Sequence, residues 1–411
     1  MAWPLIFISA GEASGELYGT QLIQAIRQIE PQASFFGLGG KRMEAAGLHR
    51  IVRAEDVAIM GITEVIRHMP RIYGEYRKLK RSVQRRDNET TGLPDVAILI
   101  DFPDVNLSLA RELHRLRIPV IFFVSPQLWA WKKHRIKQVQ RYVDRMLVIF
   151  PFEEKFYEDH GVAATFVGHP LADLPTPWIS RAGFGEEYCL DTEKEWVAIL
   201  PGSRSREIEL NLPIILQAAE DYGEEVEFIL PLAPTLTRTQ RARVVAMIEK
   251  ISAPHTVALV TLVDDARAAL YHARAGVVAS GTATVEAALI GNPFLVVYRI
   301  SALSYAVAKR VVKVPFVAMV NLIAQREVVP ELIQGDFTAA NLVSHLRRLM
   351  HNEEDRKIMK QGLREVAGML RHTKDESGET TIGRVATIAL RLATSSTAKS
   401  AQTSIVSSKF R

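Results

Sequence analysis

The stretch "PLIFISAGEASGELYG" (residues 4–19) joins an apolar run to a glycine-containing loop and then to a helical pattern. This is where nucleotide-binding α/β proteins often place a phosphate loop. However, no Gly-Lys-Ser/Thr follows, and the glycines stand four residues apart, outside the Gly-x-Gly-x-x-Gly spacing. The loop instead carries Glu12 and Glu16, whose carboxylates would repel a phosphate in a partly desolvated site. We therefore predict that Glu12 accepts sugar hydroxyls or a proton, with Gly11 and Ser14 beside the substrate; Glu16 could also simply complement the helix dipole.

Short apolar stretches alternate with helical patterns on both sides of a proline-rich segment near residues 170 to 190. This alternation predicts βαβ units, hence two Rossmann-like parallel-sheet α/β domains with a cleft between them. In the first half the predicted strands lie within 4–10, 33–40, 95–101, 119–125 and 145–150. In the second half they lie within 196–204, 226–233, 256–263 and 275–299. We expect domains over 1–175 and 190–370, a helix over 371–393 that packs on the first domain or on a partner chain, and a disordered Ser/Thr-rich tail over 394–411.

Composition limits the class of protein. With 411 residues, the chain exceeds the usual size of a single core. Its one cysteine, Cys189, excludes a disulfide framework and a cysteine-based metal site. No acidic or histidine cluster has metal-ligand spacing, so we predict neither metal nor cofactor. No leader and no run of about 18 apolar residues is present, which leads us to expect a cytoplasmic protein.

The net charge of +5 suggests an anionic partner, and its distribution is uneven. Residues 64–86 combine one apolar helix face with eight Lys or Arg residues, and a second basic stretch follows Trp129 and Trp131. Each could be an ordinary solvated helix, but together they favour contact with a membrane surface. The residues expected at that surface are Met60, Ile66, Met69, Ile72, Trp129 and Trp131. We expect no nucleic-acid binding, because no recognised motif or stacking platform is present.

Two loops of the second half follow predicted strands and suit an anion. The first holds Gly202, Ser203 and Arg204. Its small residues let backbone N–H groups approach a phosphate, and Arg204 offers a guanidinium fork. The second holds Ser280, Gly281 and Thr282, with Glu286 one turn into the next helix, where a carboxylate can hold two ribose hydroxyls. We therefore predict that a nucleotide binds the second domain.

Asp101 directly follows the apolar run "VAILI" in the first domain. An acid just beyond a central strand lies at the carboxyl edge of a parallel sheet, where ligands bind. Asp101 is our first candidate for a general base, with Glu12 as the second; capping of the following helix fits Asp104 better.

The motifs together resemble the lipid-A-disaccharide synthase family. They are "AGEASGE", "VAIMGITEV", "IDFPDVN", "FVSPQLWAWKKHR", "FPFEEKFY", "FVGHPLAD", "LPGSRSREIE", "SGTATVEAAL" and "NLIAQRE". The resemblance implies a GT-B fold and an inverting transfer of 2,3-diacylglucosamine from its UDP derivative to 2,3-diacylglucosamine 1-phosphate (lipid X). It also implies that Asn321 and Gln325 help to hold the nucleotide, and that the protein associates peripherally with the cytoplasmic face of the inner membrane. A second copy of the chain, forming a homodimer, is also a possible partner.

Two other functions fit the residues. The first is another GT-B enzyme, such as a UDP-GlcNAc transferase or 2-epimerase, which would share the nucleotide loops without needing a basic amphipathic helix. The second is a basic membrane- or nucleic-acid-binding protein with a degenerate nucleotide site, which would show steep salt dependence of binding and no affinity for UDP.

Overall fold

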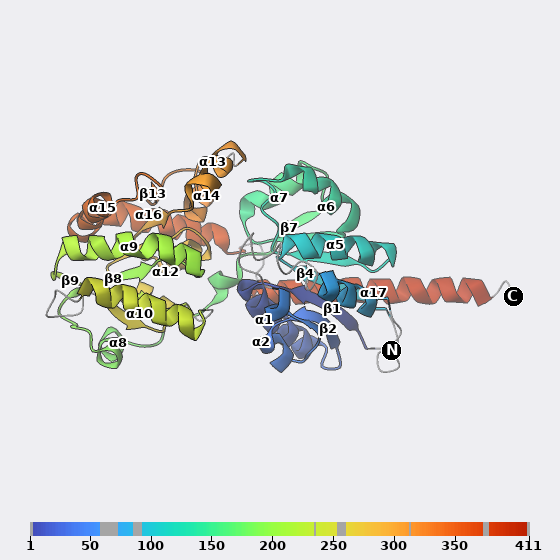
Figure 1. Ribbon diagram of the computed structural model, residues 1–411. Helices are drawn as coiled ribbons and strands as arrows, with labels where there is room; N and C mark the ends of the chain where they lie inside the picture. Colours follow the sequence, from blue (N-terminus) through green and yellow to red (C-terminus); the bar gives the residue numbers. More distant parts are fainter. Residues whose placement is uncertain are drawn as a thin grey trace. The chain divides into compact units, whose positions relative to one another are not determined.

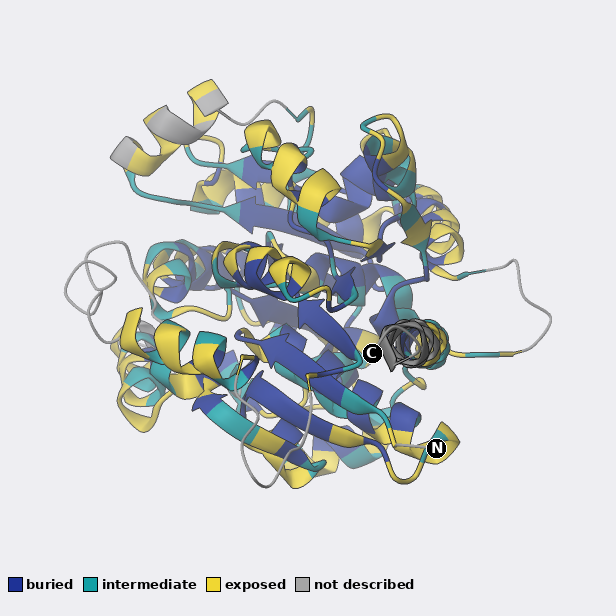
Figure 2. Ribbon diagram, turned by 90° about the vertical axis from the view of Figure 1, so that its right-hand side faces the viewer, coloured by how far each residue is buried: buried dark blue, intermediate teal, exposed yellow. Residues whose placement is uncertain are grey.

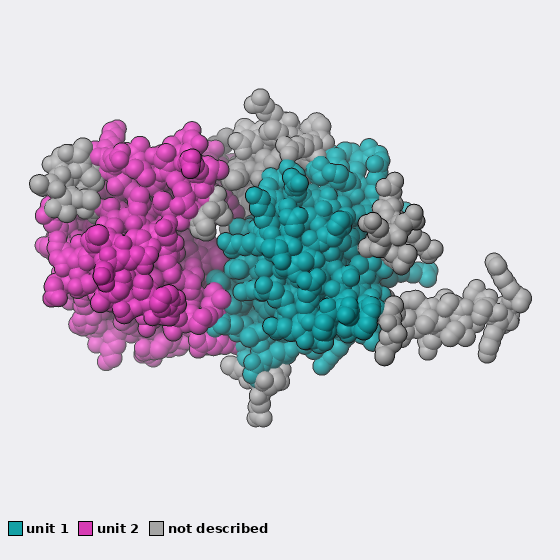
Figure 3. Space-filling model, turned by 90° about the horizontal axis from the view of Figure 1, so that it is seen from below, with its two compact units in different colours: residues 1–173, 372–411 teal, residues 174–371 magenta. Residues whose placement is uncertain are grey.

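The computed structural model describes residues 3–57, 73–84, 93–233, 236–252, 260–311, 314–372 and 378–408. The chain forms two compact units: Met1–Asp173 together with His372–Arg411, and Leu174–Arg371 (Figure 3). The division after Asp173 falls within the predicted proline-rich hinge. No helix in the described segments has both the length and the apolarity needed to cross a membrane.

Unit 1 is built on a parallel sheet whose described strands run in the order β3-β2-β1-β4-β5-β6-β7. Every residue of β4 (Val96–Ile100) is buried, as expected for a parallel strand covered on both faces. Figure 2 shows buried strands inside the layers of helices. The strands are β1 (Leu5–Ala10), β2 (Ser34–Gly39), β3 (Leu48–Arg53), β4 (Val96–Ile100), β5 (Val120–Phe123), β6 (Arg145–Val148) and β7 (Ala164–Phe166). The helices are α1 (Ala13–Ile29), α2 (Lys41–Ala45), α3 (Ala54–Val57), residues 73–82, α5 (Pro103–Arg115), η1 (Lys133–Arg135), α6 (Ile136–Tyr142), α7 (Pro151–Glu158), η2 (Pro170–Asp173) and α17 (Thr381–Ser408).

Helix α17 returns the chain to unit 1 and lies against α1, β4 and η2 (Figure 1). Its buried side chains recur at helical spacing, at Ile382, Val385, Ala386, Ala389 and Ala393. Helix α17 continues to Ser408, into the segment 394–411 that is expected to be a disordered tail, and that expectation stays a prediction. Beyond Gly383 the segment contains neither Gly nor Pro, the two strongest helix breakers.

Unit 2 has the same architecture, with described strands in the order β10-β9-β8-β11-β12-β13. The strands are β8 (Glu195–Leu200), β9 (Val226–Pro231), β10 (Val260–Val263), β11 (Ala275–Ala279), β12 (Phe294–Tyr298) and β13 (Glu331–Ile333). The helices are α8 (Arg181–Tyr188), α9 (Ser205–Tyr222), α10 (Arg238–Ser252), α11 (Ala266–His272), α12 (Thr282–Ile290), α13 (Ala302–Val311), α14 (Met319–Ala324), α15 (Ala339–His351) and α16 (Glu353–Leu370). Helices α8, α11, α15 and α16 begin at side-chain caps, namely Ser180, Asp265, Thr338 and Asn352.

Candidate functional site

In unit 1 the strand order reverses between β1 and β4, which is where open α/β sheets bind ligands. The loop at Glu12 follows β1, and Asp101 follows β4. The last residues of these two strands, Ala10 and Ile100, are paired across the sheet. The ring of Phe102 lies so close to Gly11 that a Cβ at position 11 would stand 2.5 Å from it. The structure therefore brings the two predicted carboxylate-bearing loops together, and the contact requires glycine at position 11.

Asp101 lies in a strained turn. Asp101 and Phe102 are consecutive non-glycine residues with φ of 48° and 49°, in the left-handed region. The buried side chain of Asn106 donates hydrogen bonds to the main-chain oxygens of Asp101 (2.7 Å) and Ile100 (3.2 Å), and accepts one from the Ser9 hydroxyl (2.6 Å). Strain of this kind persists only where surrounding bonds determine it, and it is concentrated at functional sites. Asp101 is half-buried at this edge of the sheet.

The two carboxylates of the opening loop have different surroundings. Glu16 accepts a hydrogen bond from the main-chain N–H of Arg42 at 2.8 Å, in the first turn of α2. Glu16 therefore has a structural role. It resembles the helix-capping alternative named above, except that Glu16 binds the start of α2 and not the start of its own helix, α1. Glu12 is exposed at the N-cap of α1, and its side chain makes no capping bond there. Ser14, two residues further along, is half-buried.

A buried carboxylate fixes the segment that follows β5. Glu153 accepts hydrogen bonds from the Ser125 hydroxyl (2.6 Å), the Trp129 indole N–H (3.0 Å) and the main-chain N–H of Phe150 (3.2 Å). Burial raises the pKa of Glu153 to about 7, against the opposite effect of these bonds. Trp129 is thus held inward, whereas Trp131 is 45% exposed. Of the two tryptophans, Trp131 has the more accessible ring.

The described part of the predicted basic helix buries its apolar face at Leu79 and Val83, although Tyr73 at its start is 59% exposed. Leu79 and Val83 are each 1% exposed and belong to the core of unit 1. Lys80 pairs with Glu112 at 2.8 Å. This corrects the prediction of a free amphipathic face for residues 73–84, because the same apolar spacing serves a protein core. Four other residues expected at the membrane lie outside the described residues: Met60, Ile66, Met69 and Ile72.

In unit 2 the strand order reverses between β8 and β11, and the two predicted anion loops follow these strands. Gly202 has a φ of 130°, and a Cβ there would stand 2.7 Å from that of Glu207. Arg204 is the N-cap of α9; its side chain is 62% exposed and pairs with Glu207 at 3.0 Å. Gly281 is the N-cap of α12, with Thr282 in its first turn. Two helix N-termini therefore flank the same edge of the sheet.

Tyr298 is a residue of this edge that the sequence analysis missed. It ends β12, the neighbour of β11. Burial raises the pKa of its hydroxyl; Glu207 adds to that shift and Arg204 opposes it, so both charges act on the phenol. The signal was available, since a tyrosine closes the apolar run "FLVVY".

Glu286 and Ser280 are held by neighbours. The Glu286 carboxylate pairs with Arg267 of α11 at 3.4 Å. Burial raises the pKa of Glu286, and Arg267 partly offsets the effect. The Ser280 hydroxyl donates to the main-chain oxygen of Val317 at 3.2 Å. Ser203 is exposed, and its main-chain N–H donates to Glu207 at 3.3 Å.

The side chain of Asn321, which is predicted to help hold the nucleotide, makes its hydrogen bonds within unit 2. It is fully buried, and its oxygen accepts from the N–H groups of Val328 (2.7 Å) and Val329 (3.0 Å). Its NH₂ group donates to the Val329 oxygen (2.8 Å) and to Glu331 (2.9 Å), so the amide is saturated within the chain. Gln325 is exposed at the C-cap of α14 and donates to the Leu322 oxygen at 2.6 Å.

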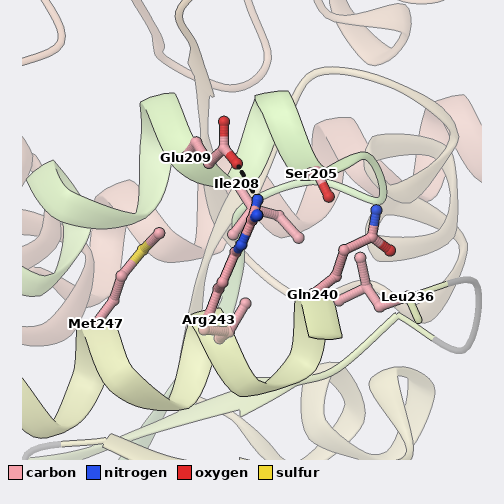
Figure 4. Close-up of a pocket in the computed structure, with 8 residues that line it drawn as sticks. Ser205, Ile208, Glu209, Leu236, Gln240, Arg243 and Met247 are labelled. Carbon is pink, nitrogen blue, oxygen red and sulfur yellow. Dashed lines mark ion pairs between the residues drawn. The ribbon is translucent and has the colours of Figure 1, made fainter. Parts of the chain in front are cut away.

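A small pocket lies between α9 and α10, lined by side chains that include Ile208, Leu236 and Met247 (Figure 4). Glu209 and Arg243 form an ion pair at its side, 3.5 Å apart. None of the predicted site residues lines it. Among the residues that the structure describes, no group of three or more His, Cys, Asp or Glu side chains could hold a metal ion.

Solved structures share the two-unit GT-B fold at low sequence identity. The calicheamicin glycosyltransferase CalG4 superposes with a TM-score of 0.59 at 13% identity, covering 95% of this chain and 98% of that one. A UDP-GlcNAc 2-epimerase from Neisseria meningitidis gives a TM-score of 0.56 at 13% identity, covering 90% and 98%. One is a glycosyltransferase and the other a 2-epimerase, so the fold alone does not distinguish between these two classes of enzyme.

Sequence relatives are more specific. The lipid-A-disaccharide synthase of Acidobacterium capsulatum is 61% identical over 392 residues, covering 94% of this chain and 96% of the relative. That of Koribacter versatilis is 48% identical over 389 residues, covering 94% and 99%. The family model described as lipid-A-disaccharide synthetase matches residues 6–384, which include both strand-order reversals. The chain belongs to the lipid-A-disaccharide synthase family.

Proposed function

We propose that this protein transfers 2,3-diacylglucosamine from its UDP derivative to the 6-hydroxyl of 2,3-diacylglucosamine 1-phosphate. The products are the β-1′,6-linked disaccharide of lipid A and UDP. Family membership over nearly the whole chain carries this proposal. The geometry supports it, because each unit places predicted site residues at the carboxyl ends of the strands where its order reverses.

Asp101 of unit 1 is the proposed general base. As the acceptor's 6-oxygen bonds to the donor's anomeric carbon, on the face opposite UDP, the hydroxyl proton passes to the Asp101 carboxylate. A positioned base contributes about 10²–10⁴-fold to such a step. Glu12, at the same edge of the sheet, is the second candidate for this role or binds acceptor hydroxyls.

Unit 2 is proposed to hold the UDP moiety and to stabilise the leaving diphosphate. As the anomeric C–O bond breaks, negative charge grows on the diphosphate. Arg204 and the N–H groups that begin α9 and α12 can meet that charge. Glu286, which pairs with Arg267, is proposed to accept hydrogen bonds from ribose hydroxyls.

The acylated substrates suggest peripheral attachment to the inner membrane. The exposed ring of Trp131 offers apolar surface for this contact. Arg77, Lys78 and Arg81 are exposed cations that can approach anionic headgroups.

The test is direct. Purified protein is incubated with both lipid substrates in detergent micelles, and UDP and the disaccharide are followed by mass spectrometry, with and without EDTA. We expect both products in equal amounts, also in EDTA. Epimerisation of the donor without disaccharide would favour the 2-epimerase, and loss of turnover in EDTA that magnesium restores would overturn the metal-free leaving-group chemistry.

A further inference from the structure

Two cations share one carboxylate three residues beyond the proposed base. The Arg135 guanidinium lies 2.5 Å from an oxygen of Asp104, and the Lys132 ammonium lies 3.9 Å from the same oxygen. The side chains of Arg135 and Lys132 are 22% and 30% exposed, whereas that of Asp104 is 67% exposed. The positive groups therefore lie deeper than the negative one. Asp104 also stands in the first turn of α5, where the helix dipole favours a carboxylate.

The segment that carries these cations has a fixed conformation. Lys132 adopts a left-handed backbone conformation, with φ of 54°, and so does Val124 at the end of β5, with φ of 62°. A β-branched residue in that region is a genuine outlier. Between the two, Ser125 and Trp129 are bound to the buried Glu153. Strain retained in this way points to a function that needs the segment in one position.

We propose that Lys132 and Arg135 bind the phosphate group of the acceptor. This inference rests on the proposed function, since it takes the acceptor to be a sugar 1-phosphate. Because Asp104 carries one negative charge against the two positive charges of Lys132 and Arg135, the group keeps a net positive charge. Arg135 supplies a planar fork for two phosphate oxygens, and Lys132 supplies a compact charge.

The location fits a substrate whose reacting hydroxyl and phosphate stand on one sugar ring. Only Phe102 and Pro103 separate Asp104 from Asp101, so the two Cα atoms are at most about 11 Å apart. The ring of Trp131 adjoins the site, with the Lys132 ammonium 4.1 Å from its centroid. Its exposed face offers apolar surface beside the cations, as an acylated sugar phosphate requires.

The experiment compares two acceptors, 2,3-diacylglucosamine with and without the 1-phosphate, in detergent micelles. The variants are Arg135→Ala, Lys132→Ala and the charge-retaining Arg135→Lys; Lys133→Ala, at an exposed cation between the two, is the matched control. We expect each Ala variant to raise the KM for the phosphorylated acceptor about tenfold or more, as for loss of a charged hydrogen bond. The KM for the donor should stay unchanged, and kcat/KM for the acceptor without phosphate should equal that of the parent. Arg135→Lys should lie between parent and Arg135→Ala.

Other outcomes would overturn the inference in distinct ways. Equal losses with both acceptors would show that these cations support the fold or the chemistry. Unchanged kinetics, together with reduced sedimentation on phosphatidylglycerol vesicles, would assign them to lipid headgroups. If the parent protein makes no disaccharide from the phosphorylated acceptor, the proposed function itself fails, and the control reaction shows this before any variant is compared.

Discussion

The side-chain amide of Asn106 donates a hydrogen bond to the main-chain oxygen of Asp101, with 2.7 Å between the two atoms. Asn106 belongs to α5, and it also joins β4 at Ile100 and β1 at Ser9. One buried residue thus connects a helix, two strands and the strained turn that carries the proposed base. The position of Asp101 depends on a side chain that is fully buried and remote from solvent.

We expect Asn106→Asp to lower kcat at least tenfold and the free energy of unfolding by about 1–3 kcal/mol. The reason is that an ionised carboxylate oxygen would face the main-chain oxygens of Ser9, Ile100 and Asp101 with no proton to donate. Urea unfolding and steady-state kinetics measure the two effects. UDP affinity should not change, since the proposed nucleotide site lies in unit 2. Ser9→Ala is the control, because it leaves the bond between Asn106 and Asp101 in place. Unchanged unfolding and kcat in Asn106→Asp would show that Asn106 does not position Asp101.

Asp101→Asn should reduce turnover by about 10²-fold or more, because the amide keeps the shape and loses the basicity. Asn tolerates the left-handed conformation of this turn, so the local backbone should persist. The affinity for UDP, measured by calorimetry, should be nearly that of the parent. Glu12→Gln is the comparison: if it loses turnover while Asp101→Asn retains it, Glu12 is the base and Asp101 only orients the acceptor.

Replacing Arg204 by Ala should weaken UDP binding by about 1.5–3 kcal/mol, the range for a hydrogen bond to a charged group. Arg206→Ala is the matched control, since it removes the same charge from an exposed position in the first turn of α9. Calorimetric titration with UDP gives both affinities. If Arg204→Ala, Glu286→Ala and the parent bound UDP with equal affinity, the prediction that UDP binds at these loops would be wrong.

The ends of β1, β4, β8 and β11 could be predicted from the sequence, because these apolar runs stop at Gly11, Asp101, Pro201-Gly202 and Ser280. Glu12, Asp101, Arg204 and Gly281 were found in this way. It could not be predicted that these four residues stand in pairs at the two strand-order reversals, because strand order depends on tertiary pairing. The edge strands β3, β7 and β13 were also missed: β7 and β13 have only three residues each, and β3 (LHRIVR) is half polar without a regular alternation.

Residue type and spacing do not reveal a side chain's partners. The sequence does not show that the Asn321 amide is saturated by Val328, Val329 and Glu331. The apolar spacing that includes Leu79 and Val83 suits a membrane face and a core face equally, and the structure uses it for the core. Only packing distinguishes the two.

Membrane contact by the exposed cations is testable without disturbing the core. Reversing Arg77, Lys78 and Arg81 to Glu should reduce sedimentation with anionic vesicles at low salt, since each basic residue near the surface contributes roughly 1 kcal/mol. Lys80 is left intact because it pairs with Glu112. Reversal of Lys357, Lys360 and Arg364, which are exposed on α16, is the control with the same change in net charge. Equal sedimentation of the two triple variants would show a nonspecific charge effect.

The buried Glu153 should make stability depend on pH in a defined direction. Its pKa rises from 4.5 to about 7 on folding because burial disfavours the charge, so between these values the folded protein binds more protons than the unfolded chain. Its contribution is therefore fully present below about pH 4.5 and is lost as the pH rises through 7. Glu153→Gln removes the titration, so the unfolding free energy of the parent minus that of the variant should fall by up to about 3 kcal/mol between about pH 5 and about pH 8. Urea unfolding across this range measures the difference, with Glu158→Gln, at the exposed end of α7, as the control. Parallel curves for parent and Glu153→Gln would mean that the carboxylate stays ionised in its buried site.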